Sequence, residues 1–125
     1  MNQKKKWILS VTVLIFLDLV AISITSTTDK ELLSVSDIYA SKILGDDVIV
    51  KGEVTAILPE YVSKKGFKYQ QFILSDENER IKVFCSEKYG KKNIAVGDTV
   101  IFEGKFQKYY GEFEIYGFCS EIKVL

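Results

Sequence analysis

The 125-residue sequence contains no histidine, and this absence excludes several classes of site. A Ser-His-Asp triad, a Cys-His pair and a zinc or haem held by imidazole all require that residue. The two cysteines are too few for a structural zinc site, which takes four ligands. No motif supplies an activated nucleophile or a phosphate-binding loop. The sequence therefore predicts a protein that is not an enzyme and that holds no metal and no cofactor.

A basic excess is also missing. The chain has 17 Lys plus Arg and 17 Asp plus Glu, and beyond residue 25 the acidic groups outnumber the basic ones by 16 to 14. A domain with this charge is a poor general binder of polyanions, so we expect only modest salt dependence if it binds nucleic acid. Hydrophobic residues make up 47% of the chain and aromatic residues 13%, which indicates one compact folded domain.

The N-terminal part of the chain has the pattern of a membrane segment. Residues 7–25, WILSVTVLIFLDLVAISIT, are apolar apart from the single charge of Asp18. A helix of about 20 apolar residues crosses a bilayer. The lysines at positions 4–6 favour a cytoplasmic N-terminus, which places the rest of the chain outside. We therefore expect residues 1–25 to anchor a single-pass protein of the cell membrane with an extracytoplasmic C-terminal domain.

The same segment also fits a cleaved signal peptide. Its apolar region would then be residues 8–17, with cleavage after small residues near 21–23 or 24–26. Asp18 favours this interpretation, because a charge at the centre of a membrane helix costs roughly 2.5–3.5 kcal/mol. The apolar residues that follow Asp18 favour the anchor. If the segment is cleaved, the protein is secreted.

Residues 26–34 are polar and few, and we expect them to tether a domain that comprises residues 35–125. The domain starts with SVSDIYASKILGDD, where serine and aspartate precede an apolar pattern that stops at Gly45. This predicts a two-turn helix with an N-cap, which packs Ile38 and Leu44 on the rest of the domain.

Beyond Gly45, alternation of apolar and polar residues replaces helical spacing and predicts strands. The first strand, over residues 47–58, has Gly52 at its middle, which indicates a bend. Four further strands are expected over residues 69–76, 80–85, 99–107 and 112–122, with a loop at 59–68, an irregular or helical connection at 86–94 and a last turn at 108–111. The phenylalanines expected in the core are Phe72, Phe102, Phe106, Phe113 and Phe118.

Three stretches in this order, VIVKGEVTAI, FILSDENERIKVF and VGDTVIFEGKFQKYYGEFEI, carry a family resemblance. Residues 46–125 resemble the OB-fold nucleic-acid-binding domains of the tRNA-anticodon-binding type. The resemblance implies an all-β domain, a five-stranded OB-fold Greek-key barrel, here preceded by a short helix and by the N-terminal transmembrane or signal helix. It also implies a ligand site on the second and third strands, between the loop after the first strand and the loop that joins the last two.

Single-stranded nucleic acid requires aromatic faces for its bases and cations for its phosphates. Residues of both kinds fall where the resemblance places the site: Lys64, Lys65, Phe67, Lys68, Tyr69, Lys82, Phe84, Lys105, Lys108, Tyr109 and Tyr110. We therefore predict a membrane-tethered binding module for single-stranded nucleic acid. The alternative is an extracytoplasmic protein-interaction or assembly factor that uses the same face, because this fold also serves other ligands.

The cysteines permit two further interpretations. Cys85 and Tyr89 have the spacing by which some haem chaperones of cytochrome c maturation, also membrane-tethered OB-folds, carry haem. In that family the motif follows the last strand, where this chain has Cys119 and, four residues on, Lys123. The OB-fold resemblance instead places the third and fifth strands side by side and parallel, so that Cys85 and Cys119 lie at one end. Outside the cytoplasm these two could form a disulfide.

Overall fold

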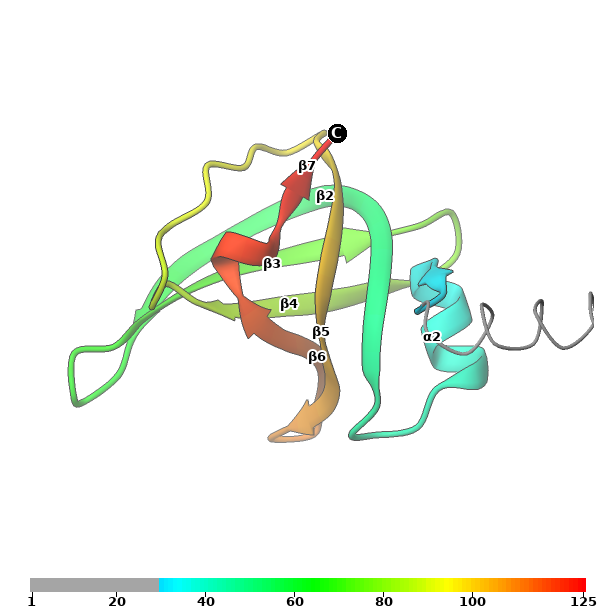
Figure 1. Cartoon of the computed structure of the whole chain (residues 1–125), viewed down its shortest axis with the longest axis horizontal. Helices are drawn as coiled ribbons and strands as arrows, with labels where there is room; N and C mark the ends of the chain where they lie inside the picture. Colours follow the sequence, from blue (N-terminus) through cyan, green and yellow to red (C-terminus); the bar gives the residue numbers. More distant parts are fainter. Residues whose placement is uncertain (1–29) are drawn as a thin grey trace, which may run out of the picture. The chain divides into compact units, whose positions relative to one another are not determined.

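The computed structural model describes residues 30–125. The predicted membrane anchor or signal peptide, residues 1–25, lies outside the described residues. Among the residues that are described, no helix has the length and apolar character needed to cross a bilayer. The described residues form a mostly-β, OB-fold-like sheet with one short α-helix (Figure 1).

The helices and strands follow one another along the chain in a simple order. They are β1 (Leu32–Leu33), α2 (Val35–Ser41), β2 (Asp47–Val62), β3 (Lys68–Ser75), β4 (Arg80–Ser86), β5 (Thr99–Tyr109), β6 (Glu112–Phe118), the 3-10 helix η1 (Cys119–Glu121) and β7 (Lys123–Val124). Leu32 and Leu33, which the sequence analysis assigns to the tether, pair in parallel with Ile49 and Val50 of β2. The domain therefore begins as a strand before the helix.

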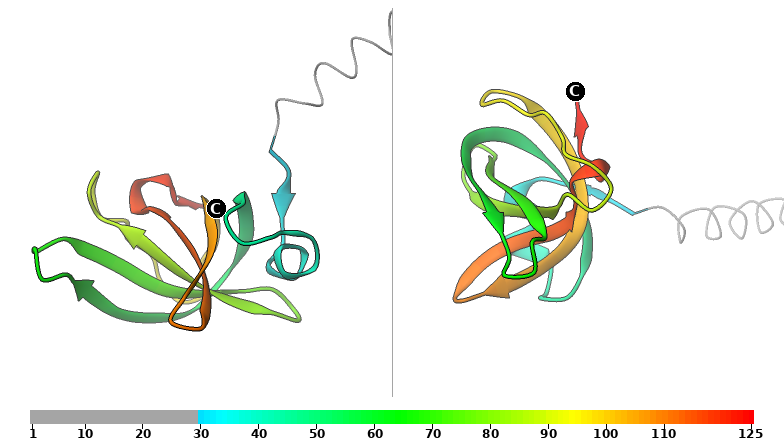
Figure 2. Two further views of the ribbon diagram at one scale, coloured as in Figure 1. Left: turned by 90° about the horizontal axis from the view of Figure 1, so that it is seen from below. Right: turned by 90° about the vertical axis from the view of Figure 1, so that its left-hand side faces the viewer.

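The five long strands pair in a closed ring. β2 pairs antiparallel with β3, β3 with β4, β6 with β5 and β5 with β2, whereas β4 and β6 run parallel. The two short strands add to this ring, β1 at β2 and β7 at β5. Figure 2 shows the sheet curving back on itself. This parallel pair is the one that the OB-fold resemblance implies for the third and fifth expected strands.

Strand β2 pairs with two strands of the ring, and Gly52 lies beside the residue at which one partner gives way to the other. Residues 47–53 pair with β5, and residues 53–62 pair with β3. A Cβ at Gly52 would lie 2.8 Å from the Cγ of Leu74 and 2.9 Å from the carbonyl oxygen of Ser75. The residue at this corner therefore needs to be glycine, as the sequence predicts for a bend.

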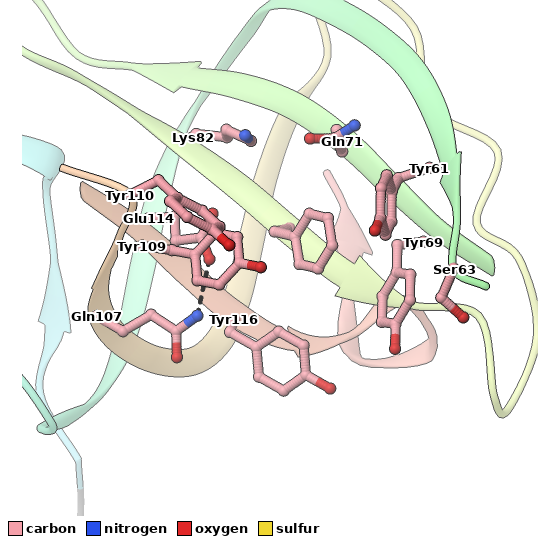
Figure 3. A pocket seen from close by; sticks show the side chains of 11 residues that line it. Tyr61, Ser63, Tyr69, Gln71, Lys82, Gln107, Tyr109, Tyr110, Glu114 and Tyr116 are labelled. Atoms are coloured by element: carbon pink, nitrogen blue, oxygen red, sulfur yellow. Dashed lines mark hydrogen bonds between the residues drawn. The ribbon is translucent and has the colours of Figure 1, made fainter. Parts of the chain in front are cut away.

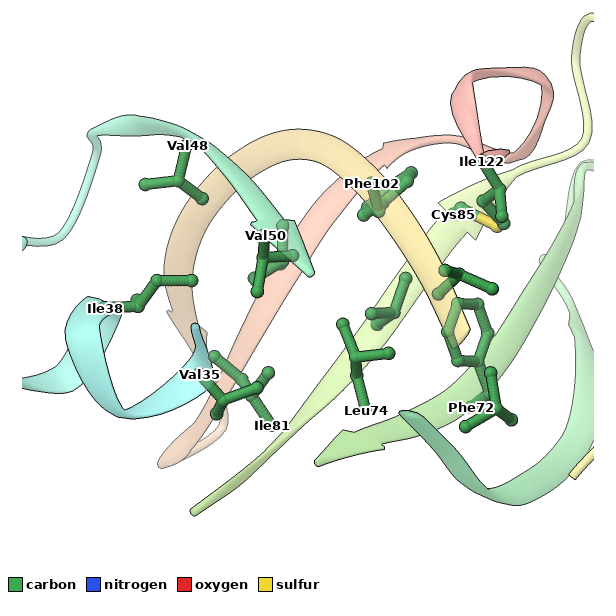
Figure 4. Close-up of a cluster of buried hydrophobic side chains, with 14 of the residues drawn as sticks. Val35, Ile38, Val48, Val50, Phe72, Leu74, Ile81, Cys85, Phe102 and Ile122 are labelled. Carbon is green, nitrogen blue, oxygen red and sulfur yellow. The ribbon is translucent and has the colours of Figure 1, made fainter. Parts of the chain in front are cut away.

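The ring encloses the core (Figure 4). Its largest fully buried side chains include Phe72, Phe102, Leu74, Ile115 and, from α2, Ile38. Phe106 is also buried, so three of the five phenylalanines predicted for the core are placed there. The prediction is wrong for Phe113 and Phe118, which are 38% and 37% exposed. Phe113 lies near the start of β6 and packs on Tyr39 and Phe106. Phe118 is the last residue of β6 and packs on Tyr89.

Helix α2 begins at an N-cap, as predicted, and the N-cap residue Ser34 belongs to a capping box. The Ser34 side chain accepts a hydrogen bond from the backbone N–H of Asp37, and the Asp37 carboxylate accepts one from the backbone N–H of Ser34. Ile38 is buried, but Leu44 is 51% exposed, which corrects the prediction that it packs on the domain. The helix ends at Ser41, and the Asp46 carboxylate then holds the backbone N–H of Ile43 in a turn that directs Leu44 outward.

Three strands end two or more residues away from the predicted position. β2 continues through Pro59 to Val62, because the pairing with β3 shifts register between Leu58 and Tyr61 and leaves proline without a ladder bond to donate. β5 extends to Tyr109, so the last turn is Tyr110–Gly111, whose φ values of 50° and 78° suit a two-residue hairpin. β6 stops at Phe118, where the chain turns into η1.

Candidate functional site

A row of aromatic rings crosses four strands on the outer face of the sheet. Tyr61 of β2 lies beside Tyr69 of β3, with 5.9 Å between ring centroids. Tyr69 stacks on Phe84 of β4 at 4.7 Å with an interplanar angle of 15°. Phe84 lies 6.2 Å from Tyr116 of β6 at an angle of 30°. The row follows from the strand register, which pairs Tyr61 with Tyr69 and Phe84 with Tyr116.

These rings face outward because their neighbours along each strand face inward. In β4, Val83 and Cys85 are buried, and Phe84 between them is half-buried. In β6, Ile115 is buried and Tyr116 follows it on the opposite face. Each of these two strands therefore supplies side chains to both the core and the aromatic row.

The aromatic row forms one wall of a cavity of about 680 Å³ (Figure 3). The β2–β3 loop borders this cavity through Ser63, and the β5–β6 hairpin borders it through Tyr109 and Tyr110. The residues that line it are Tyr61, Ser63, Tyr69, Gln71, Lys82, Phe84, Gln107, Tyr109, Tyr110, Glu114 and Tyr116. We call this space the aromatic cavity.

The aromatic cavity holds the one charged residue that is buried within residues 30–125. Glu114 is 2% exposed, and its Oε1 accepts a hydrogen bond from Gln107 Nε2 at 2.7 Å. The two residues are cross-strand neighbours in β6 and β5. Lys82 also lines the cavity, and its Nζ lies 3.4 Å from Glu112 Oε2 at the rim. The cavity therefore combines aromatic surface with one carboxylate and one ammonium group.

Tyr109 and Tyr110 form an aromatic pair at the hairpin end of the aromatic cavity. Their rings meet edge to face with 4.4 Å between centroids, and Tyr110 is 92% exposed. Hydrogen bonding and charge from Tyr110 raise the pKa of the Tyr109 hydroxyl, and burial, Tyr61 and Glu114 raise this pKa further. Tyr109 therefore stays protonated at neutral pH.

Five of the residues predicted from the sequence line the aromatic cavity: Tyr69, Lys82, Phe84, Tyr109 and Tyr110. Lys64, Lys65 and Phe67 lie instead in the exposed β2–β3 loop, which Gly66 turns with a φ of 87°. Lys68 is the first residue of β3 and is exposed. The structure thus places these four residues beside the cavity's β2–β3 end rather than in its wall.

The two lysines of β5 that the sequence predicts for the site lie on opposite faces of the strand. Lys105 pairs across the sheet with Tyr116 and shares its outer face. Lys108 pairs with Phe113, and its Nζ lies 5.0 Å from the centroid of that ring. Because Gln107 and Tyr109 on either side of Lys108 line the cavity, Lys108 points to the opposite face of the strand. Of the two, only Lys105 is placed to reach a ligand on the aromatic row.

Six residues of the cavity wall were not predicted: Tyr61, Ser63, Gln71, Gln107, Glu114 and Tyr116. Alternation in the last two strands was the available signal, because Gln107 follows the buried Phe106, and Glu114 and Tyr116 flank the buried Ile115. The sequence predicts a loop after Pro59, whereas in the structure Tyr61 lies in β2 opposite Tyr69.

The two cysteines form a disulfide between the end of β4 and the start of η1. The Cys85 and Cys119 sulfurs are 2.09 Å apart, the Cα atoms are 5.0 Å apart, and both side chains are buried. Among the described residues no cysteine is free. The haem-carrier interpretation therefore gains no support, since Cys85 has no thiol with which to attach haem.

Comparison with known proteins places the chain in a family and finds similar structures. Residues 48–125 match the family described as OB-fold nucleic acid binding domain. A crystal structure of a domain of replication protein A from Methanococcus maripaludis is similar, with a TM-score of 0.61 and 15% identity, over 76% of this chain and 96% of that one. The OB domain of a Thermoplasma acidophilum protein is similar with a TM-score of 0.56 and 20% identity, over 75% and 86% of the two chains. No curated protein matches the sequence.

Proposed function

Because the chain belongs to the family of OB-fold nucleic acid binding domains, we propose that it binds single-stranded nucleic acid along the aromatic row and in the aromatic cavity. In this proposal the closed ring of five strands is the Greek-key barrel expected from the sequence. The bound strand runs across β3, β4 and β6, between the β2–β3 loop and the β5–β6 hairpin.

The aromatic row is the observation that carries the proposal. Its rings follow one another at centroid distances of 4.7 to 6.2 Å, and all four line the cavity. Bases stack on such rings with roughly 1–3 kcal/mol for each base, whatever the sequence. A strand whose bases lie flat along Tyr69, Phe84 and Tyr116 therefore gains its affinity mainly from stacking.

The cations are few and lie where phosphates would pass. Lys82 Nζ is 6.0 Å from the centroid of the Phe84 ring, so a phosphate next to a base stacked on that ring is within its reach. Lys105 shares the face of Tyr116, and Lys64 and Lys65 lie at the β2–β3 end. With so few phosphate contacts, the affinity should fall less steeply with salt than that of a strongly basic domain.

Fluorescence anisotropy with the full chain tests the proposal. A non-ionic detergent keeps the apolar N-terminal stretch in solution, and labelled single strands of about 12 nucleotides match the site size of one OB-fold. Binding is expected at about 50 mM salt and should weaken by about 200 mM. Absence of binding at the lower salt concentration would overturn the proposal.

The substitution Tyr69→Ala should weaken binding about tenfold or more, because it removes one ring of the aromatic row on which a base would stack. Tyr89→Ala is the control, since it makes the same change at an exposed tyrosine that packs on Phe118 outside the aromatic cavity. Equal affinities for the two variants would show that the aromatic row is not the binding surface.

We also propose that the domain lies outside the cytoplasm, held by the N-terminal segment. The buried Cys85–Cys119 disulfide supports this, because disulfides persist in oxidising compartments and are rare in the cytosol. The nucleic acid bound there would be incoming or released material. Protease added to spheroplasts of an expressing bacterium should remove a C-terminal epitope from the full chain; an epitope that survives until the cells are lysed would contradict this placement.

A further inference from the structure

We propose that the aromatic cavity selects bases that carry an exocyclic amino group, such as cytosine, over thymine and uracil, and that Glu114 is the residue that makes the selection. This inference rests on the proposed function, since it concerns the base that enters the cavity.

The first step of the inference concerns the burial of Glu114. A carboxylate withdrawn from water is costly unless hydrogen bonds compensate it. Gln107 Nε2 donates one such bond to Oε1, but a carboxylate has about four acceptor positions. Glu114 lines the aromatic cavity, so the acceptor capacity that remains lies in the wall against which a ligand would pack. A ligand that donates a hydrogen bond would complete the compensation.

The second step concerns the two amide side chains in the cavity wall. Gln107 donates through Nε2 to the Glu114 carboxylate, and Gln71 donates through Nε2 to the carbonyl oxygen of Pro59 at 2.9 Å. Both partners can only accept, which fixes the orientation of each amide. The Oε1 atom of each glutamine is therefore the one left for a ligand. Together with Glu114, these atoms give the cavity a wall rich in acceptors.

The third step is the match with the bases. Cytosine has an amino group at N4, which donates to a carboxylate, whereas thymine has an acceptor oxygen at the corresponding position. Two acceptors that face each other repel, so thymine stacked in the cavity would leave Glu114 without a donor. Lys82 in the same wall disfavours a free cation as the occupant and suits a ligand that also carries a phosphate.

The test compares labelled oligocytidylate and oligothymidylate of about 12 nucleotides with the full chain. The measurement is made at mildly alkaline pH, so that cytosine stays neutral and unstructured. We expect oligocytidylate to bind about tenfold more tightly, within the range for one base-specific hydrogen-bonded contact. The variant Glu114→Gln should bring the two affinities within about twofold, because the amide can donate to thymine as well. Glu121→Gln is the control: it makes the same change at an exposed position outside the cavity and should keep the preference.

A change in the ligand tests the same contact without a change in the protein. An oligonucleotide of N4,N4-dimethylcytosine has lost both amino donors and should bind no better than oligothymidylate. Similar binding of all three oligonucleotides to the wild-type protein would overturn base selection and leave nucleic-acid binding intact. Binding of none of them would overturn the proposed function and, with it, this inference.

Discussion

The Asp76 carboxylate, in the turn between β3 and β4, accepts a hydrogen bond at 2.7 Å from the backbone N–H of Ser36, at the start of helix α2. Its other oxygen accepts from the backbone N–H groups of Asn78 and Glu79 at 2.8 and 2.7 Å. One side chain thus closes the β3–β4 turn and joins it to the first turn of the helix. Burial opposes ionisation, but the hydrogen bonds outweigh it and hold the pKa of Asp76 well below its ordinary value.

This arrangement predicts how stability depends on pH. A depressed carboxyl pKa stabilises the fold above the pKa of the unfolded chain, about 3.9, and this contribution is lost as pH falls toward the folded value. Asp76→Asn should lower the free energy of unfolding by about 1 kcal/mol at neutral pH, by analogy with the loss of a helix cap. The difference from wild type should shrink in urea titrations at acidic pH. Glu77→Gln, an exposed neighbour, is the control; a difference that does not change with pH would contradict the role of the charge.

Because of the disulfide, we expect the stability of the domain to depend on redox conditions. Cys85 and Cys119 are 34 residues apart in sequence, and closing a loop of that size stabilises a fold by about 3–4 kcal/mol. Urea unfolding with and without a reductant should differ by this amount. The double variant Cys85→Ala/Cys119→Ala should show no difference between the two conditions. If the wild-type protein is equally stable with and without reductant, although thiol titration shows complete reduction, the predicted contribution of the disulfide is wrong.

Replacement of Glu87 should change the stability of the domain in the opposite direction from replacement of Asp76. Burial, a hydrogen bond to Glu60 and the charge of Glu60 raise the pKa of Glu87, and its Oε2 is buried without a hydrogen-bond partner. The contribution of a raised carboxyl pKa is present at acidic pH and is lost as pH rises through the folded value. Glu87→Gln should therefore stabilise the domain at neutral pH by roughly 0.5–1 kcal/mol and have little effect at acidic pH. Thermal unfolding measures the effect, with Glu121→Gln as the control. Equal shifts in Tm for the two variants would contradict the role of Glu60.

The strands could be predicted because alternation survives wherever one face of the sheet is buried. Val50, Gly52 and Val54 alternate with the polar residues 51, 53 and 55 in the sequence, and both valines are buried in β2. The expectation that strand phenylalanines lie in the core is wrong for Phe113 and Phe118, which lie near the two ends of β6 and are exposed. The helix cap at Ser34 could be predicted because its hydrogen bonds join residues three apart.

The aromatic cavity could be predicted only in part, because its polar members depend on contacts between distant strands. A glutamate on the outer face of a strand is usually solvated, and local sequence gives no sign that Glu114 is buried. Its burial depends on the pairing of β6 with both β5 and β4. Tyr61 depends on the register shift that carries β2 past Pro59, and sequence alone favoured a loop there.

Strand β4 connects the disulfide with the aromatic row. Cys85 points inward and Phe84 points outward, so a slip of one residue in the pairing of β4 would exchange the two sides. Such a slip would remove Cys85 from the reach of Cys119 and take the Phe84 ring out of the row. The disulfide can therefore form only when β4 has its native register. The same register assembles the aromatic row, so every molecule with this disulfide also has Phe84 in place.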